Sequence, residues 1–161
     1  MNLKKNKNYY FSDFLSNFEK ESDSVYRLKS ENFNFEETIN QLEKNSKVRD
    51  LKNVRICLHE SDNSNVQYMI IFHSSDYKVP IHRHRSKSEF LKLHKGSCTY
   101  KDYKLSKGEF IINKKIKLNV DSVIVVPKNK WHNFEIHEDI VFTEVSEGPF
   151  NSLSTEFAST I

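Results

Sequence analysis

The chain has 161 residues, which is enough for one domain with a hydrophobic core and too few for two comfortable ones. Its 25 basic and 22 acidic residues are mixed along the sequence, so the net charge of +3 does not indicate a nucleic-acid partner. Hydrophobic residues make up only 37%, but twelve Phe and seven Tyr argue against a disordered chain.

No targeting or membrane-spanning segment is expected. The basic start is not followed by an apolar run of signal-peptide length, and no run is long enough to cross a bilayer. Cys57 and Cys98 alone do not define a disulfide framework, so we expect both to be reduced and buried. These features favour a cytoplasmic location.

Residues 1–52 are expected to form an N-terminal arm with helical character. A first short helix is predicted after Ser12, because this residue is a good N-cap and Phe11, Leu15 and Phe18 recur at helical spacing. The polar stretch from Lys20 to Asn32 is interpreted as a loop.

A second helix is predicted from Asn34, with Glu37 placed as in a capping box. Phe35, Ile39 and Leu42 would form its apolar face. The arm would then be a pad on the outside of a sheet or a contact between subunits, and a lid is the alternative.

After Asn53 the pattern changes from helical to alternating. In the first predicted strand one face is apolar (Val54, Ile56, Leu58), and the other carries functional side chains (Arg55, Cys57, His59). Further short strands are predicted at 66–72, 82–84, 90–94, 97–103, 110–112, 115–120, 122–126, 131–136 and 140–146. This spacing predicts a mainly β domain over 53–150, an antiparallel sandwich or barrel, followed by a partly frayed tail over 151–161.

Candidate metal ligands are concentrated between Pro80 and Gly96. His82 and His84 share one face of a strand, and Glu89 follows five residues later. His132 opens a later strand. Three imidazoles and a carboxylate inside a barrel would be satisfied together by one divalent ion, whereas the alternative makes the two histidines part of an exposed basic patch.

The order of these residues resembles the first motif of the cupin superfamily: His82, one residue, His84, four residues, Glu89, six residues, Gly96. The segment 127–132 is similar to the second motif. It carries Asn129 where a glycine is usual, and Asn tolerates a positive φ best after Gly. The trailing asparagine of that motif is missing, which leaves the metal ligands intact.

Within that superfamily the chain is similar to WbuC-like cupin metalloproteins, which are associated with polysaccharide and O-antigen biosynthesis. The similarity rests on Arg-Ile-Cys-Leu-His ending at His59, Val-Gln-Tyr-Met ending at Met69, Pro-Ile-His-Arg-His ending at His84, and Phe-Thr-Glu-Val-Ser-Glu-Gly-Pro-Phe ending at Phe150. The resemblance implies a double-stranded β-helix (jelly-roll barrel), often dimeric, with one metal in its mouth. It implies no settled reaction.

The ligand set of three nitrogens and one oxygen suits Fe(II), Mn(II), Ni(II) or Zn(II). Such an ion activates water, polarises a carbonyl or binds oxygen, and the sequence does not choose among these. We therefore expect one divalent transition metal ion, a sugar-like substrate with or without a phosphate group, and a homodimer.

A second group of candidates surrounds the metal ligands. Arg55 would bind a phosphate or carboxylate of the substrate, or form a salt bridge at the surface. His59 is a candidate acid or base, with a structural histidine as the alternative. Gln67 is a substrate-binding candidate only if it, and not Tyr68, faces inward. Glu144 is either the base or part of an ion pair at the rim.

The remaining polar aromatic residues are interpreted as non-functional. His73, His94 and His137 are expected at the surface, and Trp131 is expected to pack.

Three classes of function are consistent with the sequence. The first is a metal-dependent isomerase or epimerase that acts on a sugar or sugar nucleotide in surface-polysaccharide synthesis, which rests on family analogy. The second is an Fe(II)-dependent oxygenase. The third is a non-catalytic sugar-binding or regulatory module.

Overall fold

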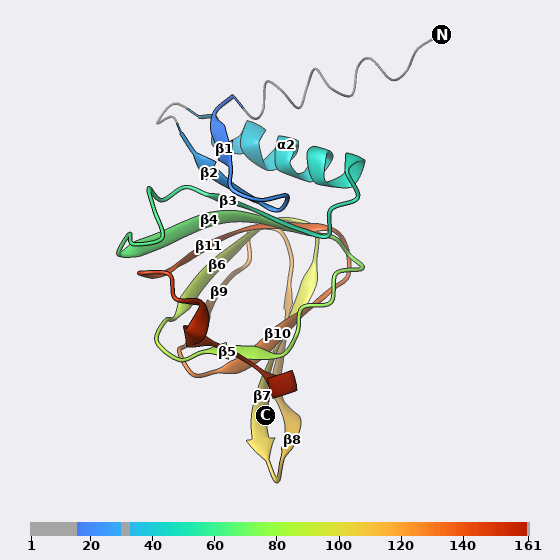
Figure 1. Cartoon of the computed structure of the whole chain (residues 1–161). Helices are drawn as coiled ribbons and strands as arrows, with labels where there is room; N and C mark the ends of the chain where they lie inside the picture. Colours follow the sequence, from blue (N-terminus) through green and yellow to red (C-terminus); the bar gives the residue numbers. More distant parts are fainter. Residues whose placement is uncertain (1–15, 30–32, 161) are drawn as a thin grey trace.

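The computed structural model describes residues 16–29 and 33–160, which form two facing β-sheets with an α-helix outside (Figure 1). The larger sheet has seven strands in the spatial order β1 (Phe18–Lys20), β2 (Val25–Leu28), β3 (Asn53–Cys57), β4 (Val66–His73), β11 (Ile140–Glu147), β6 (Glu89–Lys95) and β9 (Val123–Val126). The smaller sheet has the order β12 (Thr155–Phe157), β5 (His82–His84), β10 (Trp131–Ile136), β7 (Cys98–Ser106) and β8 (Glu109–Leu118).

Paired strands run antiparallel, except β2 and β3, which are parallel. This arrangement confirms the predicted mainly β, antiparallel barrel with a helical element. At one end the space between the sheets is filled by an apolar core, which includes Leu91, Leu93, Cys98, Leu118, Ile124 and Phe142. The other end is left open for a cavity.

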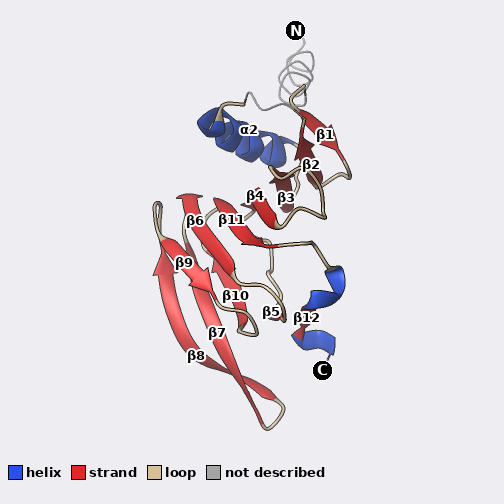
Figure 2. Ribbon diagram, turned by 90° about the vertical axis from the view of Figure 1, so that its left-hand side faces the viewer, coloured by secondary structure: helices blue, strands red, loops and turns tan. Residues whose placement is uncertain are grey.

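Helix α2 (Phe35–Val48) begins at the predicted N-cap, where the Asn34 side chain accepts a hydrogen bond from the Glu37 N–H at 2.9 Å. Its buried residues Ile39 and Leu42 pack on the outer face of the larger sheet. The sheet side of this cluster consists of Val54, Ile56, Ile70, Phe72 and Val141. Figure 2 shows the helix lying across the sheet, and it therefore forms the predicted pad.

Strand β3 has the two predicted faces. Val54 and Ile56 are 2% and 0% exposed because they lie under the helix. Arg55 and Cys57 point the opposite way and line the cavity between the sheets. Cys57 and Cys98 are buried and unpaired, as expected.

The structure corrects the predicted loop between Lys20 and Asn32. Val25–Leu28 is a strand that extends the larger sheet beside β3, and Tyr26 is buried under the helix. The predicted first helix cannot be followed, because residues 11–15 lie outside the described residues. Phe18, which was assigned to that helix, belongs to β1.

One further prediction is wrong in detail. The strands expected at 110–112 and 115–120 are one strand, β8, because it pairs with β7 along its whole length. The tail, which was expected to be partly frayed, contains η1 (Ser152–Ser154), β12 and η2 (Ala158–Thr160), and β12 pairs with β5.

The predicted division into 1–52, 53–150 and 151–161 stays a prediction, and strand pairs cross both of its boundaries. Strand β2 pairs with β3, and β12 pairs with β5. In the described ranges, no helix is both long and apolar enough to cross a bilayer.

Candidate metal centre

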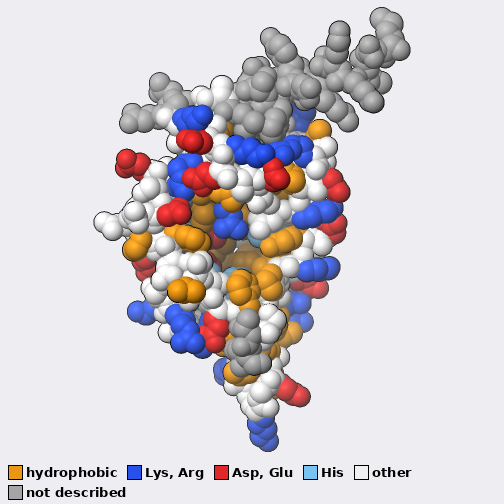
Figure 3. Space-filling model, in the orientation of Figure 1, with side chains coloured by type: hydrophobic (Ala, Val, Ile, Leu, Met, Phe, Trp, Pro, Cys, Tyr) orange, Lys and Arg blue, Asp and Glu red, His pale blue; other side chains and the backbone are white. Residues whose placement is uncertain are grey.

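A cavity of about 590 Å³ lies between the inner faces of the two sheets. Its walls carry apolar side chains from the core end, among them Leu91, Phe134 and Phe142, and polar side chains from both sheets. Figure 3 shows the hollow near the middle of this face of the molecule, with hydrophobic side chains around it and histidine atoms inside it.

The three histidines predicted to bind metal meet in this cavity. His82 and His84 lie on β5, and His132 lies on the adjacent strand β10, directly opposite His82 in the register. Ring nitrogens of the three residues lie within 4.8 Å of one another. Pairing of two strands thus brings together residues separated by about fifty positions.

The backbone orients two of these rings. Nδ1 of His82 lies 2.9 Å from the Pro80 carbonyl oxygen, and Nδ1 of His132 lies 2.9 Å from the Lys130 carbonyl oxygen. Because a carbonyl only accepts, each Nδ1 donates, which leaves Nε2 as the nitrogen that is available to an ion. This is the orientation in which metal-binding histidines are normally held. Burial and the neighbouring His132 lower the pKa of His82 to about 4, so the ring is neutral at pH 7.

The third ring is held by the C-terminal segment. Nδ1 of His84 lies 3.0 Å from the Thr155 hydroxyl on β12, and Phe157 of the same strand stacks on His82 with ring centroids 6.0 Å apart. Glu156 between them forms ion pairs with Arg83 and Arg85, which fasten β12 to β5.

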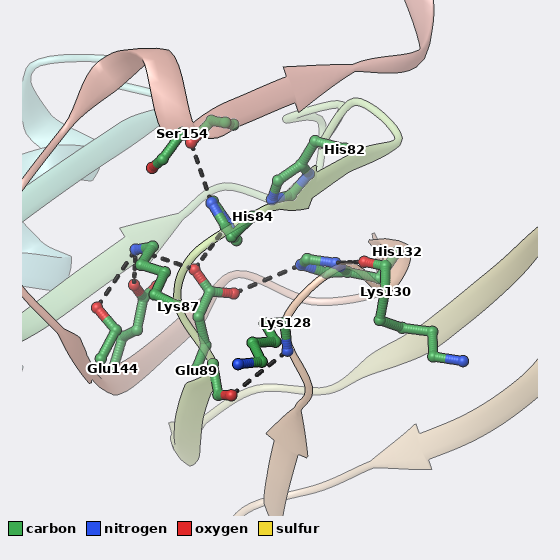
Figure 4. Close-up of polar contacts among 12 residues, drawn as sticks. His82, His84, Lys87, Glu89, Lys128, Lys130, His132, Glu144 and Ser154 are labelled. Carbon is green, nitrogen blue, oxygen red and sulfur yellow. Dashed lines mark hydrogen bonds and ion pairs between the residues drawn. The ribbon is translucent and has the colours of Figure 1, made fainter.

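Glu89 joins the histidines from β6. Its Oε1 lies 2.8 Å from His84 Nε2, and its Oε2 lies 3.5 Å from His132 Nε2 (Figure 4). Burial acts to raise the pKa of this carboxyl, but His132, His84 and Lys87 hold it well below its usual range. Glu89 is therefore a carboxylate at neutral pH.

The residues fit a divalent metal ion. His132 is 1% exposed, and its Nε2 has no hydrogen bond of normal geometry, which is costly for a buried polar atom. Neutral imidazoles and an ionised carboxylate are ligands that divalent transition metals accept.

Glu144 lies on β11 next to this group and faces the cavity, not its rim. Lys87 Nζ bridges the two carboxylates, 3.3 Å from Glu89 Oε1 and 3.5 Å from Glu144 Oε1 (Figure 4). Burial, followed by the charge of Glu89, raises the pKa of Glu144 to about 7. Glu144 therefore exchanges a proton close to neutral pH.

The other predicted site residues line the cavity at different depths. Arg55 lies on its wall. His59 also lines it, but its Nδ1 accepts a hydrogen bond from the Tyr68 N–H at 3.1 Å, and burial lowers its pKa. Gln67 faces inward, while Tyr68 is 36% exposed. The Gln67 amide donates to the carbonyls of Ser64 and Asp62, so it supports the turn before β4.

Sequence reasoning missed three residues of this region. Lys87 lies between the motif residues His84 and Glu89 in the sequence, and this position next to the ligands could have indicated that it belongs to the site. Thr155 gives no signal, because its partner His84 is 71 residues away. His73 was expected at the surface, but it is 9% exposed and lines the cavity, because β4 continues to this residue and pairs there with Asn53 and Ile140.

The two turns flagged by the motifs have the expected backbone. Asn129 has φ 62°, and its N–H donates to the His84 carbonyl oxygen at 2.7 Å, which joins the β9–β10 turn to β5. Gly96 has φ +74°, and a Cβ there would lie 2.1 Å from the Asp139 carbonyl oxygen.

Comparison with known proteins identifies the fold. A family model described as a domain of unknown function (DUF6016) matches residues 33–110. No curated protein matches. Over 66% of its length the chain is similar to the capsular polysaccharide assembling protein CapF of Staphylococcus aureus, with 16% identity and a TM-score of 0.54, and it spans only 32% of that protein.

A second similar structure is an uncharacterized conserved protein with a double-stranded β-helix domain from Klebsiella pneumoniae. It shares 10% identity, and the match covers 66% of this chain and 79% of that one with a TM-score of 0.50. The chain therefore has a double-stranded β-helix fold, as the sequence predicts.

Proposed function

We propose that this chain is a metal-binding cupin that modifies a sugar or sugar nucleotide by moving a proton next to a carbonyl, as an isomerase or epimerase does. One observation carries the proposal. Three imidazoles and the carboxylate of Glu89 converge in a cavity beside a second carboxyl, Glu144, whose pKa is about 7.

His82, His84, His132 and Glu89 would hold one divalent ion, with Fe, Mn, Ni and Zn as the candidates. When bound, such an ion acts as a Lewis acid that polarises a carbonyl or hydroxyl of the substrate. The ring orientations support this assignment, because His82 and His132 use Nδ1 for a backbone carbonyl and keep Nε2 available to an ion.

The proton transfer would fall to Glu144. Glu144 is buried in the cavity beside the proposed ligands, and a carboxyl in this position can take up a proton as a base and return it as an acid. Lys87 holds this carboxyl within reach of Glu89, and the apolar wall formed by Leu91, Phe134 and Phe142 limits access of water. His59 is the second acid–base candidate, and Gln67 supports the cavity wall beside it.

The assignment to carbohydrate chemistry rests on similarity. The motifs resemble those of WbuC-like cupins of O-antigen synthesis, and the fold resembles that of a capsular polysaccharide assembling protein. Both are analogies at the level of fold and motif, so they choose the substrate class and not the substrate. A homodimer and a cytoplasmic location complete the proposal.

Solvent-deuterium exchange tests the reaction. The metal-loaded protein is incubated with candidate keto-sugar nucleotides in D2O, and incorporation at the carbon beside the carbonyl is followed by NMR. We expect exchange by the wild type and a rate lower by about 100-fold for Glu144→Gln, because the acid–base group is lost. The control Glu109→Gln, which changes an exposed carboxylate on β8, should exchange like the wild type.

The alternatives give different results in the same samples. Binding in calorimetry without any exchange would identify a non-catalytic binding module. Oxygen uptake by the iron-loaded protein, with no turnover in its absence, would identify an oxygenase.

A further inference from the structure

The cavity continues beyond the histidines to β3 and β4, where a second polar group lines it. Asn53 and His73 are register partners on these two strands, and Arg55 is two residues from Asn53 on the same face. Side chains at such positions lie roughly 5–7 Å apart. None of the proposed metal ligands or the proposed base belongs to this group.

Two of these side chains have polar atoms without a partner among the described residues. His73 is 9% exposed and its Nδ1 makes no hydrogen bond, while its ring is held between Tyr77 and Phe142, at centroid distances of 4.6 and 5.2 Å. Asn53 Oδ1 is also buried without a partner, although its Nδ2 donates to the Tyr77 hydroxyl at 3.2 Å. Buried polar atoms left this way destabilise the fold unless something binds them.

Arg55 differs from the other arginines near the cavity. Arg27 pairs with Glu21 and Asp62 at the rim, and Arg83 and Arg85 both pair with Glu156. Within residues 16–29 and 33–160, no carboxylate lies within ion-pair distance (4.0 Å) of the Arg55 guanidinium. A guanidinium that faces a cavity and has no ion pair of its own within the described residues suits an incoming oxyanion, to which it can donate two parallel hydrogen bonds.

We propose that Arg55 and His73 form an oxyanion subsite that binds a phosphate or carboxylate group of the substrate, with Asn53 Oδ1 beside it placed to accept a hydrogen bond from a hydroxyl of the same ligand. Arg55 pairs with Ile71 on β4, and Ile71 pairs with Phe142 on β11, the strand of Glu144. Two strand spacings separate Arg55 from that strand, about 10 Å. A ligand that reaches both places is therefore a small anionic carbohydrate, with its reactive carbon near Glu144 and its anionic group at Arg55.

The oxyanion subsite does not depend on the proposed reaction. Only the identification of the ligand as a carbohydrate rests on the proposed function. Inorganic phosphate, acetate and chloride are therefore the probes, titrated into metal-free protein by calorimetry at pH 8, where imidazoles are neutral. We expect one phosphate or acetate to bind per chain, and chloride at equal ionic strength not to compete. The stronger of the two oxyanions indicates the group that the substrate carries.

Substitutions locate the binding. Arg55→Gln should weaken oxyanion binding at least tenfold, Arg55→Lys by less because the charge remains, and His73→Phe severalfold. Lys92→Gln removes an equal charge from a partly exposed position paired with Asp121 and should bind like the wild type. Melting temperatures identify any variant that fails to fold. If Arg55→Gln fails to fold, Arg55→Lys still tests the binding.

One further variant separates this subsite from the metal centre. His132→Ala should keep its oxyanion affinity even though it loses metal, so failure of the metal assignment would leave the subsite intact. The proposal is overturned if neither oxyanion binds to the wild type, or if Arg55→Gln and Arg55→Lys bind as tightly as the wild type.

Discussion

Seven histidines occur in the chain, and their surroundings distinguish their roles. His82, His84 and His132 have one ring nitrogen tied to a protein oxygen and the other directed at a shared centre. His94 packs against Phe35 of the helix, at a centroid distance of 5.4 Å, and contacts Thr143 on the outer face of the sheet. The hydrogen-bond partner of the second nitrogen, not burial alone, therefore marks the candidate ligands.

His73 supplies a prediction about pH. Burial lowers its pKa from 6.5 to about 3, so the ring stays neutral in the folded chain while the unfolded chain takes up a proton below pH 6.5. Stability is thus unaffected above that pH and falls as the pH drops toward 3. Relative to His73→Phe, metal-free wild type should lose about 1.4 kcal/mol of unfolding free energy between pH 7.5 and 5.5.

Urea unfolding at the two pH values measures this difference, in chloride buffers that do not fill the oxyanion subsite. His137→Phe is the matched control, because His137 is exposed and its ring lies at the surface, 2.8 Å from the Thr99 hydroxyl. A wild-type stability that tracks His73→Phe at both pH values would show that His73 is protonated in the fold.

At the scale of elements, the C-terminal strand β12 connects the tail to the metal centre. It pairs with β5, the strand of two candidate ligands, and its Thr155 hydroxyl meets the ring of His84. A hydroxyl in this place orients a ligand without touching the metal, and outer partners of this kind typically change affinity 10- to 100-fold.

Thr155→Val should therefore lower metal affinity about tenfold, whereas Thr155→Ser should restore it, because the shape is nearly kept and only the hydroxyl differs. Competition with a chromophoric chelator measures the affinity, and melting of the metal-free variants controls for the fold. Equal affinity of Thr155→Val and wild type would assign β12 a purely structural role.

Strands β2 and β12 were not predicted from the sequence, and both were missed for the same physical reason. Val25–Leu28 and Thr155–Phe157 are three or four residues long, too short for a recognisable alternation, and their pairing partners lie 30 and about 70 residues away. Tertiary pairing decided their structure, which local propensity does not report. Helix α2 was predictable because its cap and its apolar face are local.

For the whole molecule, the motif residues were predictable to the same degree as the barrel. His82 and His84 are placed by alternation in β5, Glu89 by the start of β6 in the facing sheet, and His132 by its position near the start of β10, so spacing alone predicted that four residues meet inside the barrel. The sequence left open whether Glu144 faces the cavity or forms an ion pair at the rim. Its inward position became clear only from the register of β11. The subsite of Arg55 and His73 needed the pairing of β3 with β4.

Folding and metal binding depend on different residues of the barrel. The apolar clusters on both sides of the larger sheet do not include the candidate ligands, so the barrel has its core without an ion. We therefore expect the chain to fold without metal. Metal should add to its stability, because the ion binds only the native state.

Metal stoichiometry tests the central claim most directly. After loading and removal of free ions, elemental analysis should find about one divalent ion per wild-type chain, and less than about a tenth of an ion in His84→Ala and His132→Ala, while both variants keep the barrel's circular dichroism. His94→Ala, which removes a histidine from the outer face, should keep about one. Less than about a tenth of an equivalent in the wild type, or full occupancy in His132→Ala, would contradict the account.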